Sequence, residues 1–305
     1  MENIFSEERA FFYSPYGFLK GANSLGEEWL SEINQSLSKG RVECFKDSSG
    51  VSIYFKKLDW DTSFFGIPFF KVEFTEFPKE VDFLVIQEAF SKFRAYIGLS
   101  FSEYYIFAEV PCEDTGVIAG LTGSGWRLIE TRMTYYRDDL QSYTYPKRNP
   151  VRNATKSDIE DLRKAAIEAV NYYDRFHADD FFLKKESDDF LAIFIENSVK
   201  GFADEVIVPA DGPANAFLTG NYLESPPSLS QKKMGKMVLS AVTGARKGWY
   251  VKLIAELSFK FKERGLDTVF MTTQATNRAV LKVWSRHGYQ FGRCSHIFST
   301  YVRGR

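Results

Sequence analysis

The stretch TTQATNRAVLKVWSRHGYQFGRCSHIF, residues 272–298, decides the fold because it predicts a strand, a short helix and a second strand in direct succession. Asn277 can cap the helix, and Gly288 supplies the left-handed residue that ends it. Between them, one helical face carries Val280, Val283, Trp284 and His287. This order of elements is typical of an α/β protein.

Composition limits the class of protein. The chain has 305 residues, 44% hydrophobic and 16% aromatic, which suffices for a sizeable core and about two domains. Lys and Arg total 39 against 40 Asp and Glu, so no global field attracts nucleic acid or an anionic membrane. No apolar run could span a bilayer and no cleavage-site pattern follows the N-terminus, which predicts a cytoplasmic protein. Cys44, Cys112 and Cys294 lie far apart without a C-x-x-C pair, which predicts neither a disulfide framework nor a zinc site.

The segment QSYTYPKRNPV, residues 141–151, is polar and contains two prolines. Such a segment continues neither a helix nor a central strand, so we place a domain boundary in it. The predicted organisation is an N-terminal module at 1–145, a linker at 146–150 and a C-terminal domain at 151–305.

Helices and strands alternate on both sides of this boundary. Upstream we expect a helix at 80–96, a strand at 103–111, a helix at 113–125 and a strand at 126–137. Downstream we expect a helix at 157–170 opened by a capping box from Ser157 to Glu160, a hairpin of 204–210 with 215–223, a strand at 237–242, a long helix at 249–265 and a strand at 268–273. A helix, a glycine, an aromatic residue and a strand occur at Gly125 and again at Gly288, 163 residues later (288 − 125). A tandem repeat and a commonplace junction explain this echo equally well.

A glycine-containing turn joins the strand at 237–242 to the long helix. A helix N-terminus with free N–H groups is a natural site for a diphosphate, and Gly244 and Gly248 would let the backbone approach it. Arg246 and Lys247 add positive charge beside the turn. An ordinary turn that binds no ligand would have the same sequence pattern.

The segment at 272–298 resembles the closing segment of the GCN5-related N-acetyltransferases. The resemblance implies two tandem modules, each a mixed, mostly antiparallel central sheet flanked by helices, and acetyl-coenzyme A as cofactor. The implied cofactor-binding residues are Ala241, Val242, Thr243, Gly244, Ala245, Arg246, Lys247, Gly248, Trp249, Asn277 and Trp284. The chain departs from the family pattern in two places: Trp284 stands where the family usually has a tyrosine acid, and the turn at 244–248 matches the phosphate loop only in part.

The departure at Trp284 leaves the catalytic acid open, because an indole does not lose its proton near neutral pH. Tyr250, Ser285 and His296 are the candidate catalytic residues. His296 lies in a strand pattern, where a structural histidine is the more common role. A structural role as the cap of the helix is a second interpretation of Asn277.

Two further segments refine the resemblance. The segment around DRFHADDFF, residues 174–182, and the segment WDTSFFG, residues 60–66, are similar to the TDP-fucosamine acetyltransferase branch. That branch implies a degenerate first module, a complete second module and the amine of a nucleotide-linked amino sugar as acceptor. Arg175, His177 and Asp179 are then the substrate-binding candidates, although a network that braces this loop would look the same. For WDTSFFG we expect core packing.

The leading hypothesis is a metal-independent N-acetyltransferase that transfers acetyl directly to a small-molecule primary amine. A backbone N–H within 241–243 would hold the oxyanion. A non-catalytic acyl-coenzyme A binding or scaffold protein is the alternative. Transfer from an aminoacyl-tRNA is a third, and the absence of net positive charge argues against it. A homodimer is left open.

Overall fold

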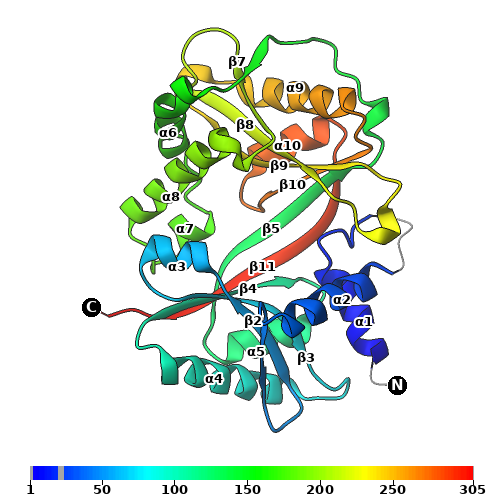
Figure 1. Cartoon of the computed structure of the whole chain (residues 1–305), viewed down its shortest axis with the longest axis vertical. Coiled ribbons are helices and arrows are strands. Elements are labelled where there is room, and N and C mark those ends of the chain that lie inside the picture. Colours follow the sequence, from blue (N-terminus) through cyan, green and yellow to red (C-terminus); the bar gives the residue numbers. More distant parts are fainter. Residues whose placement is uncertain (1–2, 20–23, 305) are drawn as a thin grey trace. The chain divides into compact units, whose positions relative to one another are not determined.

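The computed structural model describes residues 3–19 and 24–304, and residues 1, 2, 20–23 and 305 lie outside the described part. The chain forms two compact units (Figure 1). Unit 1 comprises residues 1–132 and 293–305, and unit 2 comprises residues 133–292. The division falls inside two strands, β5 (Arg127–Arg137) and β11 (Gln290–Val302), which each begin in one unit and end in the other. The predicted linker at 146–150 lies within unit 2 instead.

Unit 1 begins with two helices for which no element is predicted, α1 (Asn3–Tyr13) and α2 (Leu25–Ser38). They are followed by β1 (Glu43–Lys46), β2 (Ser52–Lys57), α3 (Asp59–Phe65), β3 (Phe69–Glu76), α4 (Phe83–Ser100), β4 (Tyr104–Pro111) and α5 (Thr115–Gly123). The strand order is β1-β2-β3-β4-β11-β5. The pairs β1–β2, β2–β3 and β4–β11 are antiparallel and β3–β4 is parallel, so the sheet is mixed and mostly antiparallel as predicted.

Unit 2 repeats this plan with the strand order β5-β10-β9-β8-β7-β6. Its elements are β6 (Val151–Asn153), α6 (Ile159–Glu168), α7 (Arg175–Ala178), α8 (Lys184–Asn197), β7 (Glu205–Pro209), β8 (Ala216–Leu223), β9 (Met234–Val242), α9 (Trp249–Glu263), β10 (Thr268–Gln274) and α10 (Arg278–Arg286). The predicted capping box is wrong by two residues: it consists of Thr155 and Asp158, because Asp158 also pairs with Arg152.

The echo around Gly125 and Gly288 extends over whole elements. Helix α5 spans 115–123 and α10 spans 278–286, an offset of 163 residues at both ends (278 − 115 and 286 − 123). Both helices end in the same way: Trp126 N–H donates to the carbonyl of Leu121, and Tyr289 N–H donates to that of Trp284. In each case the intervening glycine has a positive φ, 79° and 76°. The two units are therefore a tandem repeat of one fold.

Each sheet face of unit 2 carries its own apolar core, because side chains alternate along a strand. Ile207 belongs to the cluster beneath α9 and α10, whereas Val206 and Val208 belong to the cluster beneath α6 and α8. Figure 1 shows these two pairs of helices beside β7 and β8. Unit 1 likewise packs α4 and α5 onto β2, β3 and β4.

The strand β9 contains a bulge. Leu218 lies opposite Ser240 and Gly220 lies opposite Met237, so two steps along β8 are matched by three along β9. The fully buried Thr219 lies at this point, and its Oγ1 accepts the N–H of Leu239 at 2.9 Å. A bulge bends the strand that carries it.

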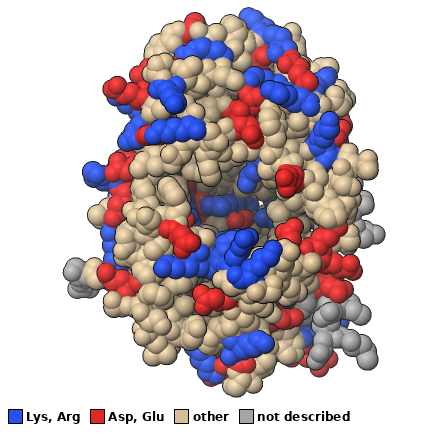
Figure 2. All heavy atoms as spheres, viewed as in Figure 1, with Lys and Arg blue, Asp and Glu red and all other residues tan. Residues whose placement is uncertain are grey.

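Acidic and basic side chains are intermingled over the face shown in Figure 2, in keeping with a formal net charge of −1. Among the described residues, no helix combines the length and apolarity that crossing a membrane would need.

The contact between Thr219 and Leu239 generates a stability prediction. Thr219→Val keeps the side-chain shape but leaves the N–H of the half-buried Leu239 without this acceptor, so we expect the free energy of unfolding to fall by about 1–3 kcal/mol. Thr219→Ser retains the hydroxyl and is the matched control. Denaturant unfolding of the three proteins measures the effect. An equal loss in both variants would show that the methyl group, and not the hydrogen bond, stabilises the bulge.

Candidate functional site

The strands β9 and β10 of unit 2 diverge. Their parallel pairing covers four residues on each strand, and among the described residues it ends at Met237 and Met271. The rest of β9, residues 238–242, contains the bulge and has no β10 partner within the described part of the chain. Val238 is 40% exposed there. A gap of this kind is where a chain-like ligand can hydrogen-bond to a strand edge.

The direction of the backbone amides along β9 follows from its contacts. Leu239 and Thr243 both donate their N–H groups toward β8, to Thr219 and to the carbonyl of Asn215 respectively. Because N–H groups alternate along a strand, the amide of Val242 points into the gap. Within the stretch 241–243 predicted to hold an oxyanion, Val242 is thus the residue with the right orientation.

The loop from Thr243 to Gly248 directly precedes the helix α9. Gly248 is the N-terminal cap residue with a φ of +89°, and no side chain in the described chain caps the helix. A Cβ atom added to Gly244 or Gly248 would meet nothing within 4 Å. The Oγ1 atom of Thr243 is buried and has no hydrogen-bond partner among the described residues. The Gly244 N–H donates to the Glu168 carboxylate at 3.3 Å. The free space at Gly244 and Gly248, the Thr243 hydroxyl and the positive end of the helix suit a bound anion.

The two basic residues of this loop differ. The guanidinium of Arg246 donates from Nε to Asn215 at 3.0 Å and from Nη2 to the carbonyl of Asp211, and it pairs with the Asp211 carboxylate at 3.4 Å. Its charge is therefore directed to the turn between β7 and β8. Lys247 is exposed, and Trp249 lies beneath Lys252, whose Nζ is 4.5 Å from the ring centroid.

Trp284 and Tyr250 form a pair. The buried indole of Trp284 donates from Nε1 to the Tyr250 hydroxyl at 2.8 Å. Burial raises the pKa of Tyr250 above its usual value, and hydrogen bonds with Trp284 and with Ser240 of β9 only partly oppose this. Tyr250 therefore stays protonated near neutral pH, and its own O–H remains a donor beside the diverging strand. Sequence patterns alone could not predict this contact between a residue of α9 and a residue of α10.

Asn277 and Ser285 lie on α10. Asn277 is the N-terminal cap residue by position, but in the described part of the chain its side chain makes no capping hydrogen bond; Nδ2 donates to Thr273 Oγ1 at 3.2 Å instead. The expectation of a side-chain cap is therefore wrong. Ser285 is exposed and its hydroxyl donates to the carbonyl of Leu281 at 3.1 Å, so it is occupied by its own helix.

His296 belongs to unit 1, whereas Tyr250 and Ser285 belong to unit 2. Its ring contacts Thr131 Oγ1 at 2.9 Å through Nδ1 and Cys112 Sγ at 3.4 Å through Nε2. Burial lowers the pKa of His296. The structure thus brings Tyr250 and Trp284 together and gives His296 separate partners.

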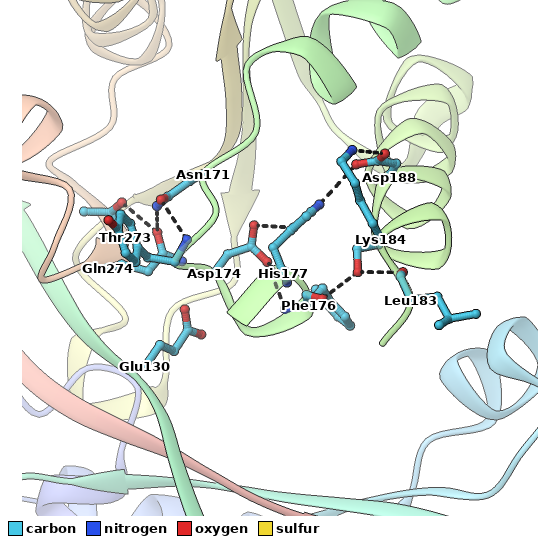
Figure 3. A network of polar contacts seen from close by, with 12 residues as sticks. Glu130, Asn171, Asp174, Phe176, His177, Leu183, Lys184, Asp188, Thr273 and Gln274 are labelled. Atoms are coloured by element: carbon cyan, nitrogen blue, oxygen red, sulfur yellow. Dashed lines mark hydrogen bonds and ion pairs between the residues drawn. The ribbon is translucent and has the colours of Figure 1, made fainter. Parts of the chain in front are cut away.

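Hydrogen bonds and ion pairs hold the loop DRFHADDFF in place (Figure 3). Asp174 caps α7 by accepting the N–H groups of Phe176 and His177 at 2.9 and 3.2 Å. His177 lies between Asp174 and Asp188, at 2.9 and 3.2 Å from their carboxylates. Burial acts to lower the pKa of His177, but the two carboxylates outweigh it and the pKa is raised. The imidazole is therefore favoured in its charged form.

The other two substrate-binding candidates are also buried. Arg175 is 7% exposed and stacks on Phe176, with 4.4 Å from its Cζ to the ring centroid. Asp179 is 2% exposed and accepts the N–H of Phe181 at 3.1 Å. These contacts favour bracing of the loop.

Exposed aromatic side chains lie on the same loop and were missed by the sequence reasoning. Tyr172 and Tyr173 are each 62% exposed. The preceding Asn171 donates to Gln274 at the end of β10, at 2.6 Å, and Figure 3 shows this link beside Thr273. The tyrosines are therefore tethered to the strand that borders the gap. In the sequence, the two adjacent aromatic residues that follow a predicted helix are the pattern that could have indicated this surface.

Comparison with solved structures gives the same fold. A GCN5-related N-acetyltransferase from Sphaerobacter thermophilus is 12% identical with a TM-score of 0.56, covering 90% of this chain and 86% of that chain. One from Kribbella flavida is 12% identical with a TM-score of 0.53, covering 91% and 96%. A tandem GNAT protein from the clavulanic acid biosynthesis pathway is 10% identical with a TM-score of 0.53, covering 99% and 96%. No protein-family model and no curated protein matches the sequence. The likeness shows a tandem GNAT fold.

The charged His177 predicts a pH dependence of stability. A histidine whose pKa is raised on folding stabilises the protein below its unfolded pKa of about 6.5, and this contribution disappears as pH rises through the folded pKa. We therefore expect His177→Gln to lower the free energy of unfolding more at pH 6 than at pH 9.

His287 provides a control of opposite sign. Burial lowers its pKa to about 4, so the stability it contributes is lost as pH falls below its unfolded pKa. Denaturant unfolding of wild type, His177→Gln and His287→Gln at pH 5, 6, 7 and 9 measures both slopes. A pH-independent effect of His177→Gln would show that His177 is neutral in the folded protein.

Proposed function

We propose that unit 2 is an acetyl-coenzyme A-dependent N-acetyltransferase that acts on a primary amine of a small molecule. The observation that carries the proposal is the divergence of β9 from β10 beside an uncapped helix N-terminus. The likeness to solved N-acetyltransferase structures supports the fold in which this arrangement occurs.

The residues of the loop fit the cofactor's diphosphate. Gly244 and Gly248 leave room for the group, Thr243 offers an unused buried hydroxyl, and the first amides of α9 point along the helix axis. The edge of β9 would hold the amide-containing arm, with the Val242 N–H among its donors. When bound, the cofactor supplies the acetyl group as a thioester that a neutral amine can attack.

The protein's part in the chemistry is to polarise and to supply a proton. The Val242 N–H is placed to stabilise negative charge on a carbonyl oxygen in the gap. The Tyr250 hydroxyl holds a proton and is oriented by Trp284, which serves as its hydrogen-bond donor. Tyr250 thus takes over the acid role that the resembled family gives to a tyrosine at the position of Trp284.

In the described part of unit 1 the corresponding helix ends are occupied by side chains, which supports a single cofactor site. The helix α4 begins with Asp82, whose carboxylate accepts the N–H of Leu84 at 2.9 Å and so fills the helix N-terminus with an anion. Asp114 corresponds to Asn277 at the offset of 163 residues (277 − 114), and it is bound by Tyr13 and Arg9 of α1 at 2.8 and 2.5 Å. A second anionic ligand would meet negative charge and an occupied surface.

A nucleotide-linked amino sugar is the acceptor that we favour. The two segments similar to the TDP-fucosamine branch motivate it, and the exposed Tyr172 and Tyr173 offer rings on which a sugar or a base could stack. Because Arg175 and Asp179 are buried, their role would be to hold the loop in shape. Mass spectrometry on a panel of amines that includes amino-sugar nucleotides would identify the acceptor.

The replacement of the usual tyrosine by Trp284 favours one competing function, a non-catalytic acyl-coenzyme A binding protein. The two proposals share the cofactor-binding site and differ in whether the Tyr250 hydroxyl donates a proton during acetyl transfer. Cofactor binding without acetylation of any amine in the panel would support the competing function.

Binding is tested at Gly244. Gly244→Val places a side chain in open space at an ordinary φ, so the fold should be retained while the diphosphate is excluded. Loss of one charge-assisted hydrogen bond costs about 1.5–3 kcal/mol, so we expect the dissociation constant of coenzyme A to rise about tenfold or more. Gly248 is less suitable, because any side chain there is strained at a φ of +89°.

Titration calorimetry gives both the affinity and the stoichiometry. We expect one coenzyme A per wild-type chain. The control is Gly98→Ala in α4 of unit 1, where an added Cβ is also accommodated. Unchanged affinity in Gly244→Val, or two sites per chain, would contradict the placement.

The proton donor is tested at Tyr250. Tyr250→Phe keeps the ring and removes the hydroxyl, so we expect kcat to fall by about 10²–10³-fold with little change in coenzyme A affinity. Trp284→Phe leaves the Tyr250 hydroxyl in place and should keep most of the activity. Steady-state kinetics on both variants measures this. The reverse ranking of the two variants would exclude Tyr250 as the donor.

A further inference from the structure

Two cysteines, a histidine and a threonine form a cluster in unit 1 that the proposed function does not use. Cys112 follows β4, and Cys294 and His296 lie on β11. The imidazole of His296 contacts Cys112 Sγ at 3.4 Å through Nε2 and Thr131 Oγ1 at 2.9 Å through Nδ1. Burial and the neighbouring Cys294 thiol raise the pKa of Cys112 to about 12. All three thiols of the chain are free.

The strand register places the two cysteines opposite each other. Ser295 pairs with Pro111 in the antiparallel ladder, and Cys112 N–H donates to the carbonyl of Cys294 at 3.2 Å, continuing that ladder by one step. Residues in such a hydrogen-bonded pair have Cα atoms about 5.5 Å apart and side chains on the same face. That separation is within the range of a disulfide.

Both cysteines are also partly exposed, so a small molecule can reach them. A metal site is a poorer explanation, because in the described part of the chain no group of three His, Cys, Asp or Glu side chains could hold a metal ion.

We propose that Cys112 and Cys294 are a redox-active dithiol that low-molecular-weight disulfides oxidise to an intramolecular disulfide, with His296 as the base that activates Cys112. With Thr131 accepting from Nδ1, the lone pair of Nε2 is directed at the Cys112 thiol. The proton of that thiol then has an acceptor at contact distance.

The exchange balances in two steps. Cys112 transfers its proton to His296 and attacks the external disulfide, forming a mixed disulfide and releasing one small thiolate, which takes up the proton. Cys294 then attacks Cys112 Sγ, its proton goes to the second small thiolate, and the S–S bond between the two strands forms. The protein loses two electrons and two protons, and the oxidant becomes two thiols.

Oxidation of the full chain with glutathione disulfide tests the proposal. We expect the number of thiols that react with an aromatic disulfide reagent to fall from three to one under denaturing conditions. Mass spectrometry should show a loss of about 2 Da and a cross-linked pair of peptides that contain Cys112 and Cys294. Cys44→Ser is the matched control and should form the same disulfide, since Cys44 lies on β1, which neighbours neither β4 nor β11 in the sheet.

Single substitutions separate the roles. Cys112→Ser and Cys294→Ser should each stop at a mixed disulfide with glutathione or remain reduced. His296→Gln should reach the same disulfide about 10²-fold more slowly, the lower end for removal of a positioned base. Thermal unfolding of each reduced variant confirms that it is folded.

Three results would overturn the proposal. Three thiols that persist in wild type at high oxidant would exclude a reactive pair, and a disulfide that includes Cys44 would show a different partner. A His296→Gln rate equal to that of wild type would remove the base from the mechanism.

Discussion

The hydrogen bond from the Leu239 amide to the buried Thr219 hydroxyl is the contact on which the candidate site depends. It accommodates one extra residue in β9, and beyond that residue β9 leaves β10. The exposed edge of β9, the orientation of the Val242 amide and the position of the loop before α9 all follow from this bend. Unit 1 has the same construction: one step along β2 is matched by two along β3 between Tyr54 and Phe55, and β3 pairs with β4 over four residues only. A backbone irregularity is thus the element of the repeat at which a strand leaves its parallel neighbour.

The two units differ in the charges at two corresponding helix ends. At the N-terminus of α9 a glycine leaves the helix uncapped, whereas Asp82 neutralises the same end of α4. In unit 1, α1 covers the position of Asp114, and Arg9 stacks 4.0 Å from the ring centroid of Phe77 while pairing with that carboxylate. The backbone is alike in both units, and the side chains at two helix ends differ.

Local patterns predicted much of this fold and less of its site. The long helix at α9, the hairpin of β7 and β8, and Gly288 at the end of α10 have strong periodic or turn signals, and the structure confirms them. The bulge, the pairing of Trp284 with Tyr250 and the engagement of Arg246 by Asp211 depend on contacts between residues distant in sequence, which periodicity does not encode. The same limit explains why three widely spaced cysteines gave no sign that two of them lie side by side.

The path of β5 and β11 has a consequence for how the protein is made. The part of β11 that belongs to unit 1, residues 293–302, follows all of unit 2 along the chain. On the ribosome, the edge of β4 therefore stays unpaired until the C-terminal half has been synthesised, although domains usually fold in order from the N-terminus. An open strand edge invites pairing with other chains, so the nascent first half is the stage at which chaperones would matter most. No cut of the chain into two contiguous pieces leaves both units whole.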